Sequence, residues 1–134
     1  MKQTAAEWIV KAEADFATMQ RESRVRRKPN YDAVCFHAQQ CAEKYIKARL
    51  CEAGISFGKV HDLVALLEQA LTVERGMEKF REDLAYLSDF AVIYRYPGES
   101  ADKNIAKDAK KRCTRFRKAA RLILNIDKDK NRLF

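Results

Sequence analysis

The sequence predicts an all-α protein, an up-and-down four-helix bundle with one additional short helix. Three observations support this prediction. The 134 residues include only 4 glycines and 2 prolines, too few for the many turns of an all-β fold. Long segments carry apolar residues at intervals of three and four, which is the period of a helix that buries one face. Hydrophobic residues make up 47% of the chain, enough to form a core.

The first helix is expected over residues 4–28. Thr4 is followed three residues later by Glu7, which is the pattern of a capping box at a helix start. Apolar residues then recur at helical spacing from Trp8 to Met19. Pro29 disfavours helical geometry in the residue before it, so the helix is expected to end at about residue 28.

Three further helices follow in the next part of the chain. The second is expected over 31–53, where Gly54 provides a C-cap. A short third helix is expected over 61–71. Gly76 interrupts the pattern, and a fourth helix is then expected over 77–94.

A last helix closes the predicted bundle. Residues 96–98 read Tyr-Pro-Gly, which is typical of a turn, and either Ser100 or Asp102 is expected to cap the helix that follows. No internal repeat or second domain is evident. We therefore expect one helical domain over 1–127 and a basic tail over 128–134.

Basic residues are concentrated in two segments. The chain carries a formal charge of +8, and residues 103–132 alone contribute +9. A second cluster comprises Arg21, Arg24, Arg26, Arg27 and Lys28. Such surfaces attract nucleotides, nucleic acids or acidic proteins, although a run of cations is also typical of a solubilising helix face.

The cysteines and the chain ends indicate a cytoplasmic protein without a metal site. The sequence contains no C-x-x-C pair and only two histidines, so we expect no zinc site. We expect all four cysteines to be small, partly buried residues in a reducing compartment. No apolar segment approaches the length of a membrane span or resembles a signal peptide, so no membrane contact is expected.

Polar residues on the second helix form the first candidate site. His37, Gln40, Lys44 and Lys47 follow one another at spacings that place them on one side of the helix. An imidazole, an amide and two ammonium groups in a row indicate a surface for phosphates or bases. The alternative is a solvated face on which Glu43 and Lys47 form an ordinary i,i+4 pair.

Two later segments add candidates. His61 is expected near the N-cap of the third helix, where Asp62 suits the helix dipole, so their adjacency is weak evidence for a catalytic pair. Arg95 is expected at the end of the fourth helix, held by Pro97, and its guanidinium can clamp a phosphate. Arg95 can instead neutralise the carbonyls at that helix end. Tyr96 can stack on a base.

These segments together resemble the HEPN domain (higher eukaryotes and prokaryotes nucleotide-binding). The residues concerned are AQQCAEKYIKA at 38–48, then Gly54, HDL at 61–63 and RYP at 95–97. Their order and spacing are similar to those of the family over nearly the whole chain, from about Ala6 to Leu124. The resemblance implies a bundle of four or five helices that forms a homodimer. It also implies a small, separately encoded minimal nucleotidyltransferase as partner, in modules that often behave as toxin–antitoxin systems.

Many members of this family are metal-independent ribonucleases, and their motif is an Arg and a His separated by four to six residues. Here nine residues separate Arg27 from His37, eleven separate Arg49 from His61, and no His follows Arg95. Cleavage of RNA by general acid–base catalysis relies on such a histidine. The chain therefore resembles the non-nuclease branch, and we assign no catalytic residue.

Three functions remain open, and the first is favoured. The chain is a nucleotide-binding module for ATP or GTP, a ribonuclease with a degenerate motif built on His37 or His61 with Arg95, or a non-catalytic helical adaptor for an acidic protein. The first needs no cofactor or metal and assumes that its side chains converge on one cationic pocket. Its predicted binding residues are His37, Gln40, Lys44, Lys47, His61, Arg95 and Tyr96.

Overall fold

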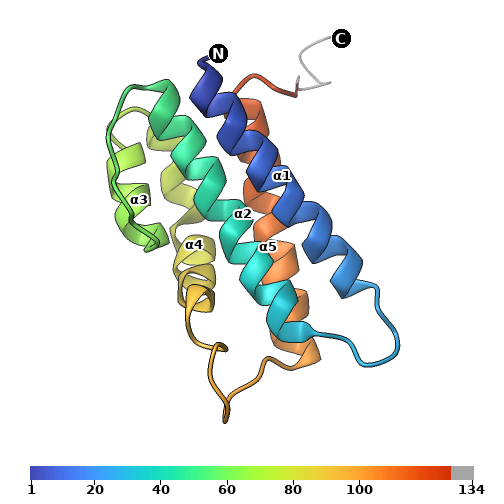
Figure 1. Cartoon of the computed structure of the whole chain (residues 1–134). Helices are drawn as coiled ribbons and strands as arrows, with labels where there is room; N and C mark the ends of the chain where they lie inside the picture. Colours follow the sequence, from blue (N-terminus) through green and yellow to red (C-terminus); the bar gives the residue numbers. More distant parts are fainter. Residues whose placement is uncertain (128–134) are drawn as a thin grey trace.

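Three long helices lie side by side and short helices cover the remaining face, as Figure 1 shows. The computed structural model describes residues 1–127, and within this range the prediction of an all-α fold is confirmed. The three long helices are α1 (Gln3–Ser23), α2 (Tyr31–Glu52) and α5 (Lys103–Ile123). The short helices are α3 (Leu63–Ala70), η1 (Arg75–Phe80), α4 (Arg81–Ser88) and η2 (Asp89–Ala91).

The central helix is α2, which packs against α1, α5, α3 and α4. A helix enclosed on several sides must be apolar around most of its circumference. Val34, Tyr45, Ile46 and Leu50 are accordingly all fully buried, although they point in different directions around the helix. The core therefore surrounds α2, and the polar residues of this helix are the ones that need an explanation.

The first helix differs from the sequence prediction at both ends. It begins at Gln3, before Thr4, with Lys2 as a cap that makes no side-chain hydrogen bond, so the predicted capping box is wrong. It ends at Ser23 rather than near residue 28. In the basic segment that follows, Val25 is the one apolar residue and is 39% exposed, so another helical turn would gain no burial.

The predicted fourth helix is divided into three pieces. The 3-10 helix η1 precedes the eight-residue α4, and the 3-10 helix η2 follows it, so regular helix ends well before Tyr94. Val92 and Ile93 are exposed, so extending the helix through them would bury no apolar surface. Arg95 consequently lies in a turn beyond the helix, not at its end.

Side-chain caps set the starts of α2, α3 and α5. Asn30 accepts a hydrogen bond from the Ala33 amide at the start of α2. Asp62 caps α3, so His61 lies just outside that helix. Asp102 caps α5, which confirms one of the two predicted alternatives. Gly54 has a φ of 74°, the left-handed geometry expected of a residue that ends α2.

The α1–α2 connection and the connection into α5 lie at the same end of the bundle (Figure 1). The Ala101 amide donates a hydrogen bond of 2.6 Å to Asp32, which joins the second connection to the start of α2. This contact places the two basic segments of the sequence beside each other. The whole of the predicted basic tail, residues 128–134, lies outside the described residues.

Within residues 1–127, none of the helices is both long and apolar enough to cross a bilayer. The four cysteines are free, and Cys35, Cys41 and Cys113 are buried among apolar side chains. Burial raises the pKa of the Cys35 thiol to about 12. These cysteines are therefore core residues, as the sequence predicted.

Candidate functional site

Two of the predicted binding residues form ion pairs with a carboxylate of α1. The Nδ1 atom of His37 lies 2.8 Å from an oxygen of Asp15, and the Lys44 ammonium donates to the other oxygen. Burial raises the pKa of Asp15, but the hydrogen bonds from His37 and Lys44 outweigh it, and the pKa is lowered overall. The Lys44 ammonium and the His37 ring therefore each already contact an internal carboxylate.

Three more of the predicted residues belong to a network around the buried Glu43, which is only 3% exposed, although His61 itself is exposed. Its carboxylate accepts hydrogen bonds of 3.0 Å from Lys47 and from Gln39. The Nδ1 atom of His61 lies 3.1 and 3.2 Å from its two oxygens, and Gln40 donates to the Gln39 side chain. The i,i+4 pair of Glu43 and Lys47 is thus present, but it is buried rather than solvated.

Aromatic rings enclose the ammonium group of Lys47. Trp8 of α1 and Phe57 of the α2–α3 connection lie with their centroids 5.4 and 5.5 Å from the nitrogen. Cation–π contacts of this kind stabilise a buried ammonium. Lys47 therefore holds the α2–α3 connection against the bundle, and little of it is open to a ligand.

The remaining two predicted residues lie in the exposed turn after η2. The Arg95 amide donates to the Val92 carbonyl, and Tyr96 is 71% exposed. Within residues 1–127, neither side chain makes a hydrogen bond or ion pair with the residues around Asp15 or Glu43. The seven predicted residues are thus divided among three places and do not converge on one pocket.

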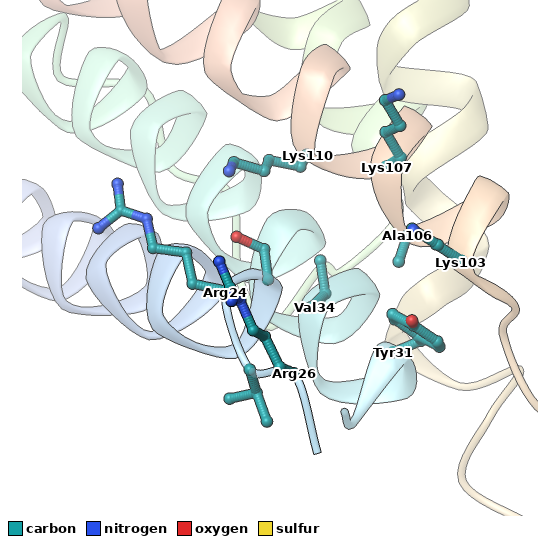
Figure 2. Close-up of a pocket in the computed structure, with 10 residues that line it drawn as sticks. Arg24, Arg26, Tyr31, Val34, Lys103, Ala106, Lys107 and Lys110 are labelled. Atoms are coloured by element: carbon teal, nitrogen blue, oxygen red, sulfur yellow. The ribbon is translucent and has the colours of Figure 1, made fainter. Parts of the chain in front are cut away.

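A different set of cations surrounds a cavity of about 740 Å³ at one end of the bundle. We call it the cationic cavity. It opens between the end of α1, the start of α2 and the first turns of α5, and Figure 2 shows Lys110 extending from α5 toward the side of Arg24. The residues that line it are Ser23, Arg24, Val25, Arg26, Tyr31, Val34, Lys103, Ala106, Lys107 and Lys110.

The ends of three helices hold these cations in place. α1 stops at Ser23, so Arg24 and Arg26 lie on the connection that passes the mouth of the cavity. Asn30 starts α2 and thereby places Tyr31 in the lining. Asp102 starts α5, so Lys103 and the lysines of its next two turns lie on the opposite side. The cavity is therefore a product of where the helices begin and end.

The five cations of the lining have no carboxylate within 4.0 Å among the described residues. Buried Val34 and nearly buried Ala106 form an apolar floor, and Tyr31 is half-buried beside them. The described lining contains no Asp, Glu, His or Cys, so it lacks the usual metal ligands. Unpaired cations around an apolar floor suit an anion that carries a flat ring.

The two basic segments of the sequence are a signal for this site, although none of their residues is among the seven predicted binding residues. Both basic segments were identified as surfaces for phosphates, but separately. A first helix that continued to residue 28 would have carried Arg24 and Arg26 away from α5. The contact between the start of α2 and Ala101 joins residues far apart in the chain, and no local pattern encodes such a contact.

A second group of cations on α5 is neutralised by internal carboxylates. Arg117 donates two hydrogen bonds, of 2.7 and 2.6 Å, to Glu13 of α1, and Tyr45 donates to the same carboxylate. The hydrogen bonds from Arg117, and to a lesser extent from Tyr45, lower the pKa of Glu13 against the opposing effect of burial. These contacts fasten α5 to α1.

We expect acid to destabilise the protein through the two α1 carboxylates, Glu13 and Asp15. Their pKa values are lowered by folding from ordinary values of 4.5 and 3.8. Such groups stabilise the fold when the pH is above their pKa in the unfolded state. This stabilisation is lost as the pH falls through their pKa in the folded state. Urea unfolding from neutral pH down to about pH 3 should show the free energy of unfolding falling below about pH 4.5.

The same measurement on variants identifies the groups responsible. Glu13→Gln and Asp15→Asn should each be less stable at neutral pH and lose less stability in acid than the wild type. Glu82→Gln is the control, since Glu82 is exposed and has no ion pair within residues 1–127. An acid response that is unchanged in both α1 variants would contradict the assignment.

The HEPN domain family matches residues 5–124 of the chain. Among solved structures, the chain is similar to the crystal structure of ST0689, an archaeal HEPN homologue, with a TM-score of 0.71 and 21% sequence identity. The alignment covers 90% of this chain and 97% of that chain, and at this identity the likeness concerns the fold. No curated protein matches the sequence significantly.

Proposed function

Because the chain belongs to the HEPN domain family, we propose that it is a nucleotide-binding module and that the cationic cavity is its binding site. One observation carries this proposal: five cations from two segments surround a cavity of about 740 Å³ and have no carboxylate partner within the described residues. This volume is within the roughly 300–1,000 Å³ of small-molecule sites. Free positive charge around a pocket of this size favours a small polyanion.

The lining supplies the two kinds of contact that a nucleotide needs. Arg24 can bind a phosphate with both arms of its guanidinium, while Lys107 and Lys110 act as point charges. The floor of Val34 and the ring of Tyr31 offer an apolar surface to a base. The sequence has no glycine-rich phosphate loop, so side chains rather than backbone amides hold the phosphates.

The proposal assigns binding to the cavity in preference to Lys44 and Lys47. Both of these lysines have carboxylate partners, Asp15 and Glu43, and a phosphate would have to displace them. Glu43 is buried, so removing Lys47 would leave its carboxylate without its lysine partner in the core. No catalytic residue is assigned. A homodimer and a nucleotidyltransferase partner remain predictions of the family resemblance, and a cytoplasmic location remains a prediction from the sequence.

Replacing two cations of the cavity should remove most of the nucleotide affinity. A hydrogen bond to a charged group contributes about 1.5–3 kcal/mol, so the double variant Arg24→Ala, Lys110→Ala should bind ATP or GTP at least about 100-fold more weakly. Calorimetric titration at low and at moderate salt measures this change. We also expect excess Mg²⁺ to weaken binding, because it neutralises the phosphates and the lining offers it no carboxylate.

A matched variant separates a site from general attraction. Lys59→Ala with Arg75→Ala also removes one lysine and one arginine, and both residues are exposed cations without an ion pair within residues 1–127. This variant should bind as the wild type does. Equal losses in the two double variants, or no binding of either nucleotide to the wild type, would overturn the proposal.

A further inference from the structure

The lysines and the arginines of α5 have different environments. Every arginine of this helix has a carboxylate partner within 4.0 Å, and no lysine has one among the described residues. The arginine pairs are Arg112 and Arg115 with Asp83, Arg112 with Asp108, Arg117 and Arg121 with Glu13, and Arg121 with Asp127. The arginines thus join α5 to the rest of the bundle and, through Asp127, to the residues that follow the helix. The lysine charges remain available to bind an anion.

The unpaired lysines follow one side of the helix. At about 100° per residue they fall within an arc of roughly 100°, centred about 130° away from the mean direction of the buried residues. Four of them are exposed, and we call these the lysine ridge: Lys103, Lys107, Lys111 and Lys118. At 1.5 Å per residue the ridge is about 22 Å long. Its first two members also line the cationic cavity, so ridge and cavity are continuous.

We propose that a single-stranded nucleic acid binds along the lysine ridge with one of its nucleotides in the cationic cavity, a proposal that rests on the proposed function of that cavity. The charges of the ridge are about one helical turn apart near the cavity, with Lys103, Lys107 and Lys111 separated by about 6 Å each. A line of cations at such intervals tracks a phosphate backbone. In Figure 2 the side chain of Lys107 does not extend toward Arg24 as that of Lys110 does.

The composition of the ridge favours a nucleic acid over an acidic protein. Protein interfaces have an apolar centre and contain few lysines. None of the exposed large hydrophobic residues among 1–127 is on α5. Between Lys111 and Lys118 the same side of the helix carries exposed Thr114, which is also polar. The ridge therefore presents positive charge without an apolar centre, which suits a phosphate backbone better than a protein partner.

The cavity favours a single strand over a duplex. Its floor of Val34 and Ala106 lies below the five cations, and the Tyr31 ring lies beside it. A base can reach such a floor only if it is unpaired and free to leave its stack. A duplex could contact the ridge through its phosphates but would leave the cavity empty.

The test measures binding of labelled oligouridylates of about four to sixteen nucleotides, the range of known single-strand site sizes. Affinity should rise with length and level off once the strand is longer than the ridge. The plot of log affinity against log salt should have a slope of about −3, because each of the four phosphate contacts contributes about −0.7. The RNA should remain intact.

Two double variants then locate the strand. Lys111→Glu with Lys118→Glu reverses the two ridge charges outside the cavity, and should weaken long oligouridylates about tenfold or more while ATP binding stays unchanged. Lys59→Glu with Arg75→Glu changes the net charge equally at exposed positions away from α5, and should leave both affinities near the wild-type values.

The outcomes separate the two proposals. If ATP binds normally and the ridge variant keeps its affinity for long oligouridylates, the ridge proposal is wrong and the cavity stands. If neither ATP nor oligouridylate binds to the wild type, the proposed function fails and the ridge proposal with it. Tighter binding of blunt duplex RNA, or equally tight binding of polyglutamate that the ridge variant loses, would also overturn the ridge proposal.

Discussion

Glu43→Ala is expected to lower the free energy of unfolding by about 3–5 kcal/mol, the range measured when one member of a buried ion pair is removed. The reason is the group left behind. Lys47 is almost fully buried, and its ammonium lies between Trp8 and Phe57 with Glu43 as its one carboxylate partner among the described residues. His61 would lose its carboxylate as well. Chemical denaturation followed by circular dichroism measures the change.

Two further variants show that the loss comes from the unpaired cation. Replacing both partners, with Glu43→Leu and Lys47→Met, removes the charges together and should recover most of the lost stability. Glu78→Ala breaks an exposed ion pair with Arg81 and should leave stability unchanged within error. If Glu43→Ala proves as harmless as Glu78→Ala, the buried network does not stabilise the fold.

Phe116→Ala should destabilise the protein by about 3–5 kcal/mol through a different cause, a cavity in the core. Phe116 is fully buried on the inner side of α5, where its ring meets that of Phe80 edge to face at a centroid distance of 5.5 Å. Truncation removes this contact and the apolar surface that holds α5 in place. The urea midpoint should fall accordingly at neutral pH.

A double-mutant cycle with Phe80→Ala isolates the ring pair. The coupling between the two aromatic side chains should be about 0.5–1.5 kcal/mol, and the rest of the loss belongs to burial. Thr114→Ala, at an exposed position on α5, is the control and should change stability little. A loss below 1 kcal/mol for Phe116→Ala would show that α5 packs more loosely than described.

The sequence predicted the fold well because helical packing leaves a periodic pattern in the residues themselves. The apolar positions of the long helices, the cap of α5 and the role of Gly54 all depend on neighbours within a few residues. The early end of α1 and the division of the fourth helix were not predicted. Both depend on whether tertiary contacts bury the next turn, and for Val25 and Val92 they do not.

The candidate site was harder to predict because charge does not reveal its partners. His37 and Lys44 look like unpaired polar groups in the sequence, but Asp15, which both contact, lies on a different helix. Arg24 and Lys110 look like ordinary surface residues, and only the meeting of three helix ends gives them a cavity to share. Which cations are neutralised is decided by contacts across the fold.

The different roles of the arginines and the lysines of α5 have an evolutionary consequence. Arginines such as Arg117 hold the helix through carboxylates of other elements, whereas lysines such as Lys111 form no ion pair within residues 1–127. Mutations at the lysine positions can therefore accumulate with little effect on folding, since surface substitutions away from such contacts change stability by less than about 0.5 kcal/mol. Homologous proteins can therefore change the ligand that these lysine positions bind while they keep the same fold.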